Sequence, residues 1–164
     1  MPVHIVILGC GRVGSTLAHE LDRLGHSVAV VDLDAGAFRR LPADFNGLTV
    51  KGVGFDRETL EIAGIERADA FAAVSSGDNT NIIGARVARE TYGVERVVAR
   101  IYDPRRAEIY ERLGIPTVAT VSWTAVQIMR RLLPLGAATA YQDPTGAVTL
   151  AEVHLGTRWI GHRS

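Results

Sequence analysis

A glycine-rich hexapeptide near the amino terminus is the part of the sequence best suited to binding a charged ligand. Residues 9–14 read Gly-Cys-Gly-Arg-Val-Gly, directly follow an apolar run at 3–8, and precede Asp32 by about 20 residues. Strand, G-x-G-x-x-G turn, helix and terminal acid in this order form a dinucleotide-binding fingerprint. Gly9 permits a tight turn, Gly11 lets the backbone approach a pyrophosphate, and Gly14 allows close packing of helix on strand. Free amides at the helix start add partial positive charge, which favours a phosphate.

Asp32 determines which nucleotides such a site would accept. A carboxylate at the end of the second strand accepts hydrogen bonds from ribose hydroxyls and repels a 2′-phosphate. Leu33 and Asp34 follow it, where an arginine would favour NADP(H). The sequence therefore predicts NAD(H) or a simple adenine nucleotide, ADP or ATP. Because Asp32 lies at the open end of the sheet, its loss is expected to cost little stability without ligand.

Further ligand contacts are expected beyond the carboxyl ends of the other strands, where doubly wound sheets bind their ligands. For the two serines in this set, the alternative is that they only cap the helix that follows. Arg12, in the first turn of the phosphate-binding helix, either meets a phosphate or stays in solvent. The positions at these strand ends are Gly52, Val53, Gly54, Ser75, Ser76, Gly77 and Arg100.

The rest of the chain predicts elements that would hold these residues in place. Short apolar runs alternate with amphipathic stretches, which indicates an α/β fold of the Rossmann type, a doubly wound parallel sheet with flanking helices. Asp56 and Asp103 are placed as helix N-caps, and Pro104 takes a first helical turn. Glycines that end helices stand at 25, 64 and 114. The expected strands cover residues 3–8, 27–32, 48–51, 70–74, 96–101 and 117–119.

The last predicted helix covers about residues 123–133 and carries many apolar side chains. They are too many for the outer face of one small sheet, so we expect a homodimer or a larger assembly. The side chains concerned are Trp123, Val126, Ile128, Met129, Leu132 and Leu133.

The carboxyl-terminal stretch has a different pattern. Pro134 and Gly136 break the helix, residues 143–146 read as a turn between two β-like segments, and 148–159 resembles a strand without a sheet. A lone strand or hairpin is marginal by itself. We therefore expect that this segment pairs with another subunit or that the chain is a fragment of a longer protein. We assign 1–134 to a nucleotide-binding domain and 135–164 to a linker and the start of a truncated C-terminal domain, with a short β-like tail.

Composition excludes several classes of protein. The chain has 164 residues, 18 basic and 18 acidic, with the charges scattered along it. No basic block marks a nucleic-acid partner. The single cysteine, Cys10, cannot form an internal disulfide, which fits a cytoplasmic location. No stretch approaches the roughly 20 apolar residues of a membrane helix, so no direct membrane insertion is expected.

Catalytic residues are not grouped in the sequence. A dehydrogenase needs an acid or base near the nicotinamide and a second structure to hold its substrate. The five histidines are dispersed, Lys51 is the single lysine, and no Cys, His or carboxylate cluster has metal-ligand spacing. A binding protein is therefore expected rather than an enzyme.

Over about residues 3–123 the chain resembles the N-terminal RCK or KTN domain of the TrkA family, regulatory subunits of bacterial Trk and Ktr potassium uptake systems. The resemblance implies a cytoplasmic protein, peripheral to the inner face of the membrane through its partner, that binds NAD(H), ADP or ATP. It also implies a homodimer that assembles into a ring beneath a potassium transporter and gates it by changing conformation, without catalysis. Nucleotide contacts are implied for Gly9 to Val13, Asp32, Ser75, Ser76 and Arg100. Besides the glycine motif, it rests on residues 31–34, 63–70, 78–81, 100, 103–104 and 113–115.

Two departures from the family pattern limit what carries over. Val53 stands where members commonly have an acidic or amide residue beside the adenine, so adenine recognition is expected to use backbone groups. Ser122 stands at about the position where some members have a glutamate that helps hold a divalent cation between subunits, so that cation site is not expected. Two alternatives stay open: an NAD-dependent oxidoreductase domain lacking its catalytic partner domain, and a scaffold that has lost its ligand.

Overall fold

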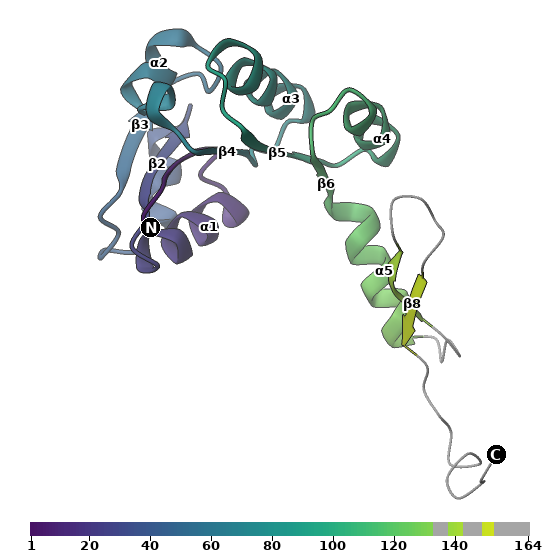
Figure 1. Cartoon of the computed structure of the whole chain (residues 1–164). Coiled ribbons are helices and arrows are strands. Elements are labelled where there is room, and N and C mark those ends of the chain that lie inside the picture. Colours follow the sequence, from purple (N-terminus) through teal and green to yellow (C-terminus); the bar gives the residue numbers. More distant parts are fainter. Residues whose placement is uncertain (133–137, 143–148, 153–164) are drawn as a thin grey trace, which may run out of the picture. The chain divides into compact units, whose positions relative to one another are not determined.

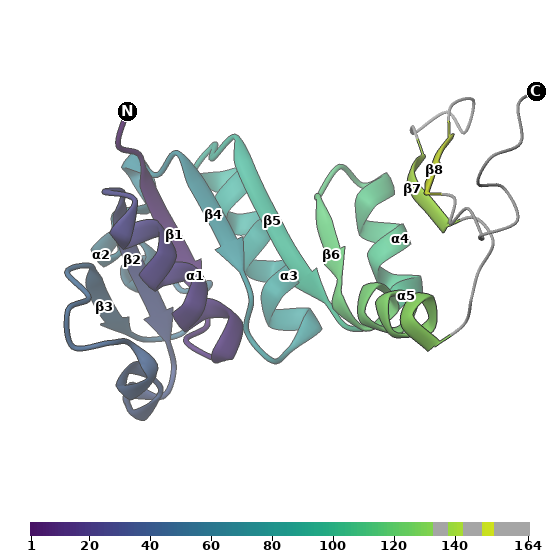
Figure 2. The ribbon, with the colours of Figure 1, turned by 90° about the horizontal axis from the view of Figure 1, so that it is seen from below.

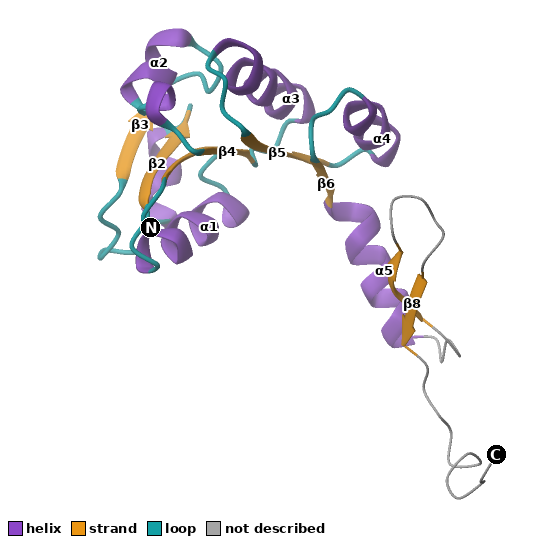
Figure 3. Ribbon diagram, in the orientation of Figure 1, coloured by secondary structure: helices purple, strands orange, loops and turns teal. Residues whose placement is uncertain are grey.

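The computed structural model describes residues 1–132, 138–142 and 149–152. The chain divides into two compact units, Met1–Val121 and Ser122–Ser164. In the first unit, strands and helices alternate along the chain (Figure 3). The predicted boundary between residues 134 and 135 stays a prediction, since residues 133–137 lie outside the described part.

A six-stranded sheet forms the centre of the first unit. All of its neighbouring strands are parallel, and their order is β3-β2-β1-β4-β5-β6 (Figure 2). This confirms the predicted doubly wound sheet, in which the order reverses beside β1 and opens a crevice at the carboxyl ends. The strands are β1 (His4–Leu8), β2 (Ser27–Asp32), β3 (Leu48–Lys51), β4 (Ala70–Ala73), β5 (Arg96–Ile101) and β6 (Thr117–Ala119).

Helices cover both faces of this sheet. Helix α1 lies on one face, and α2, α3 and α4 lie on the other (Figure 1). The predicted caps are present: the Asp56 carboxylate accepts from the Thr59 amide at 3.1 Å, and that of Asp103 from the Arg105 amide at 2.9 Å. The helices are α1 (Arg12–Arg23), α2 (Arg57–Ile62), α3 (Asp78–Arg86), α4 (Pro104–Arg112) and α5 (Thr120–Leu132), with the 3-10 helices η1 (Ala35–Arg40) and η2 (Ile65–Arg67) and the π-turn η3 (Val87–Thr91).

Strand β1 shows why the apolar runs in the sequence are continuous. Its side chains alternate between two faces, and both faces are covered. Ile5 and Ile7 join the cluster beneath α1, whereas Val6 and Leu8 join the larger cluster beneath α2, α3 and α4. All five residues of the strand are buried. The two core layers therefore fix the carboxyl end of β1, from which the glycine loop starts.

The described part of the tail corrects one expectation. The segment expected to be a strand without a sheet forms β8 (Thr149–Glu152), which pairs antiparallel with β7 (Ala138–Gln142). The expectation was wrong because it assigned no partner to residues 148–159, although the turn signal at 143–146 already separated two β-like segments. Residues 143–148 and 153–164 lie outside the described part.

Helix α5 begins at Thr120, earlier than expected, directly after β6. Its large apolar side chains are exposed, including Trp123 at 65% and Leu132 at 74%. Such a surface is unusual for an isolated protein and keeps the expected homodimer open as a proposal. Among the described helices, none is long and apolar enough to cross a membrane.

Candidate ligand-binding site

The glycine loop has the geometry that its sequence predicts. Gly9 has φ +104°, and a Cβ atom placed on it would lie 2.6 Å from the Cα of Ser75. A Cβ on Gly14 would lie 1.8 Å from the Gly9 carbonyl oxygen. Gly11 has nothing within 4 Å of its Cβ position, so its backbone is open to a ligand. Two glycines are thus required by packing, and the third leaves space.

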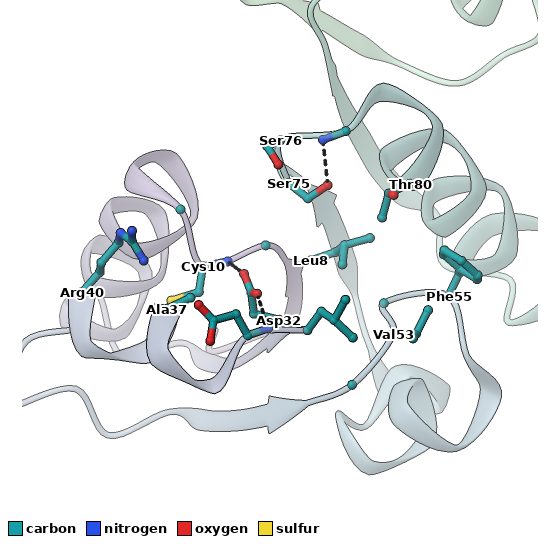
Figure 4. Close-up of a pocket in the computed structure, with 17 residues that line it drawn as sticks. Leu8, Cys10, Asp32, Ala37, Arg40, Val53, Phe55, Ser75, Ser76 and Thr80 are labelled. Carbon is teal, nitrogen blue, oxygen red and sulfur yellow. Dashed lines mark hydrogen bonds between the residues drawn. The ribbon is translucent and has the colours of Figure 1, made fainter.

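Asp32 connects this loop with the segment that follows β2. Its carboxylate accepts the Cys10 amide at 2.7 Å through Oδ2 and the Asp34 amide at 2.9 Å through Oδ1 (Figure 4). Each oxygen keeps a further lone pair that can accept a ribose hydroxyl. The acid is therefore held in one orientation before any ligand arrives, and it also holds the loop.

A pocket of about 700 Å³ opens at the carboxyl ends of β1 to β4. Glycine-loop amides, the Asp32 carboxylate and serine hydroxyls surround it, together with apolar side chains such as Val53 and Phe55 (Figure 4). Its lining residues are Leu8, Gly9, Cys10, Gly11, Asp32, Leu33, Asp34, Ala37, Arg40, Gly52, Val53, Gly54, Phe55, Ser75, Ser76, Gly77 and Thr80.

Most of the predicted site residues lie together in this pocket, but four do not. Arg12 and Val13 begin α1 with exposed side chains, and Gly14 is buried beneath the loop. Arg100 lies at the end of β5 with its guanidinium carbon 4.2 Å from the centre of the Tyr102 ring. Ligand contacts stay a prediction for all of the predicted site residues, those in the pocket included.

Gly77, expected at the end of β4 together with the two serines, lines the pocket too. Five residues that sequence reasoning missed complete the lining: Leu8, Ala37, Arg40, Phe55 and Thr80. Ala37 and Arg40 come from η1, whose start is capped by the Asp34 carboxylate accepting the Gly36 amide at 2.8 Å. The Asp-x-Gly sequence could have signalled this turn. The 3-10 helix that follows this turn places one cationic side chain, Arg40, in the lining of the pocket that also contains Asp32.

The Cys10 thiol lies in the wall of the pocket and is fully buried. Burial, with help from the Asp32 charge, raises its pKa to about 11. The thiol is therefore protonated at neutral pH and a poor nucleophile.

The guanidinium of Arg100 is partly buried near the end of β5, outside the pocket lining. Burial lowers the pKa of its guanidinium, and the charge of Asp78 acts in the opposite direction. Among the described residues, its buried Nε atom has no hydrogen-bond partner.

Within the described residues, no three His, Cys, Asp or Glu side chains are grouped so as to hold a metal ion. What the pocket offers is backbone amides for phosphate oxygens and the Asp32 carboxylate for hydroxyl groups.

Known proteins share both the sequence and the fold of this unit. The family model of the TrkA-N domain matches residues 5–121. The chain is 66% identical to the Trk system potassium uptake protein TrkA of Streptomyces coelicolor over 161 residues, which cover 98% of this chain and 72% of that relative.

Two solved structures are similar in fold. The TrkA-N domain of the inner membrane protein ybaL from Escherichia coli superposes with a TM-score of 0.68 at 20% identity, over 81% of this chain and 98% of that one. GsuK bound to ADP superposes with a TM-score of 0.62 at 26% identity, over 77% of this chain and 33% of that one.

Proposed function

Because the chain belongs to the TrkA-N domain family, we propose that it binds NAD(H) or ADP/ATP in the glycine-loop pocket as a regulatory ligand and catalyses no reaction. The observation that carries this proposal is the Asp32 carboxylate, held against the Cys10 amide beside the open backbone of Gly11. A carboxylate there matches ribose hydroxyls, and the helix start matches a phosphate. The ADP bound by GsuK, a relative in fold, supports an adenine nucleotide.

The partner follows from the relatives. The name of the Streptomyces protein, a Trk system potassium uptake protein, supports a membrane potassium transporter as the partner. In this proposal the chain stays in the cytoplasm and lies beneath the transporter as a homodimer that assembles into a larger ring. The exposed apolar side chains of α5 supply surface for that assembly. A nucleotide-dependent change of conformation then gates the transporter, since a ligand shifts an equilibrium only by binding one state better.

Gly11→Ala tests the ligand site with little disturbance of the fold. Gly11 has φ −75° and ψ −167°, which any residue adopts, and its Cβ position is free of contacts. The melting temperature without ligand should therefore stay within about 2 °C of the parent's, since the change falls in the near-neutral range of surface substitutions. In the parent, ADP or NADH at about 100 times its dissociation constant should add about 2.7 kcal/mol to the free energy of unfolding.

The methyl group of the variant occupies the space that a phosphate would approach, so this gain should largely disappear. NADP(H) should stabilise the parent less than NAD(H). The proposed site would be rejected if calorimetry showed that the parent binds none of ADP, ATP and NAD(H). It would also be rejected if Gly11→Ala bound these nucleotides as tightly as the parent. Potassium flux into vesicles that hold the transporter subunit, with and without the protein and each nucleotide, tests the regulatory role.

A further inference from the structure

Asn81 uses all of its hydrogen-bonding capacity within the protein. The side chain is fully buried in the first turns of α3. Its Oδ1 accepts the Ser75 amide at 2.8 Å and the Ser75 hydroxyl at 2.7 Å. Its Nδ2 donates to the Ser75 carbonyl at 2.9 Å and to the Arg100 carbonyl at 2.8 Å. One amide group therefore ties the loop after β4 to the end of β5.

The loop that Asn81 holds is part of the pocket wall. Ser75 lines the pocket, and its backbone lies so close to Gly9 that no side chain fits between them. A ligand that orders or shifts the glycine loop must therefore act on Ser75. Since three of the four hydrogen bonds of Asn81 go to Ser75, a displacement there reaches Asn81 directly.

The first turn of α3 makes a second connection to the same distant segment. The Asp78 carboxylate accepts the amides of Tyr102 at 2.8 Å and Asp103 at 3.1 Å. Asp103 in turn caps α4. Helix α3 therefore forms hydrogen bonds both to the Arg100 carbonyl, near the end of β5, and to the turn that starts α4. Neither segment lines the pocket.

We propose that Asn81 is a positioning residue that couples occupancy of the glycine-loop pocket to the segment between β5 and α4. The proposal rests on the proposed function, because it requires a nucleotide in that pocket. Coupling through a buried amide is physically reasonable, since an interior hydrogen bond lost on one side leaves an unpaired polar group that is costly. A nucleotide that fixes Ser75 thereby stabilises the Arg100 end of β5.

Amide hydrogen exchange of the whole chain, followed residue by residue by NMR with saturating ADP or NADH, tests the coupling. In the parent, ligand at about 100 times its dissociation constant should slow exchange at Cys10 and Gly11 by up to about 100-fold, and should also slow Tyr102 and Asp103. Asn81→Asp keeps acceptors for the Ser75 amide and hydroxyl but removes both donors of the amide, to the Ser75 carbonyl and to the Arg100 carbonyl. At equal saturation, the ligand should still slow amide exchange at Cys10 in this variant. At Tyr102 it should slow exchange at least about tenfold less than in the parent.

Asn79→Asp is the matched control. It makes the same chemical change in the same turn of α3, but Asn79 is exposed, and the one donor to its Oδ1 among the described residues is Arg106, at 2.8 Å. It should respond to ligand as the parent does.

The outcomes separate the two proposals. If calorimetry shows no nucleotide binding to the parent, both proposals fall. If the parent binds and Cys10 is protected while Tyr102 and Asp103 exchange unchanged, the coupling alone is refuted, even if Asn81→Asp cannot be folded. A folded Asn81→Asp with the full response at Tyr102 refutes it equally.

Discussion

Replacing Asp32 by alanine should change both the stability of the protein without ligand and its affinity for the proposed nucleotide, and the two effects can be measured separately. The first effect needs no ligand. Alanine removes the acceptor of two backbone amides, those of the buried Cys10 and the exposed Asp34. Water can replace the carboxylate at Asp34 but not readily at Cys10, so the net loss is that of one charge-assisted hydrogen bond, about 1.5–3 kcal/mol.

For a chain of this size that loss corresponds to a fall in melting temperature of roughly 3–12 °C. The sequence alone predicted almost no change without ligand, because it could not show that the side chain holds the glycine loop.

The second effect is on affinity. Loss of the hydrogen bonds to the ribose hydroxyls should weaken ADP or NADH binding about 10- to 100-fold, and the preference against NADP(H) should relax. Thermal unfolding without ligand and titration calorimetry measure the two effects. Asp69→Ala is the matched control: its carboxylate accepts the His4 amide at 2.8 Å, at the amino end of the sheet.

Asp69→Ala should therefore lower stability by a similar amount and leave nucleotide affinity unchanged. Two results would contradict the reasoning: an Asp32→Ala protein that binds as tightly as the parent, or one whose melting temperature without ligand is unchanged.

Other substitutions give further expected outcomes. Gly14→Ala should cost more than about 3 kcal/mol in urea unfolding, because its methyl group meets the Gly9 carbonyl, whereas Gly25→Ala, at φ +82° with free space around it, should cost about 1 kcal/mol; equal costs would contradict this. Since burial raises the pKa of the Cys10 thiol to about 11 against an ordinary 9.0, the free energy of unfolding should fall as pH rises from about 9 to about 11; a parent whose stability over that range changes no more than that of Cys10→Ser would contradict this. Trp123→Glu should shift the protein toward monomer in analytical ultracentrifugation, because a charge at an apolar interface is costly; a parent that is already monomeric at high concentration removes the proposed assembly.

The local parts of this structure could be predicted because their determinants are local. A buried parallel strand such as β1 requires a continuous apolar run. Asp56 and Asp103 cap helices through hydrogen bonds to residues only two or three positions further along the chain. The glycine loop was predictable for the same reason, since spacing within six residues sets its turn.

What could not be predicted depends on side chains that meet across the fold. Nothing in the sequence near Asn81 indicates that its amide reaches the Arg100 carbonyl, 19 residues away. The position of Arg100 followed from topology, but its packing on Tyr102 depends on the turn after β5. Arg40 was missed because a 3-10 helix, which has no strong apolar period, carries it to the pocket.

The place of β1 between β2 and β4 has a consequence for synthesis of the chain. Ile5 pairs with Val28 on one side and with Ala70 on the other, so one edge of β1 stays unpaired until some 65 further residues have been made. At about 5–20 residues per second, the ribosome needs roughly 3 to 13 s to supply them. During that interval the nascent chain presents a bare apolar strand edge, the kind of template that promotes association between chains. A chaperone that covered His4–Leu8 during that interval would therefore limit such association.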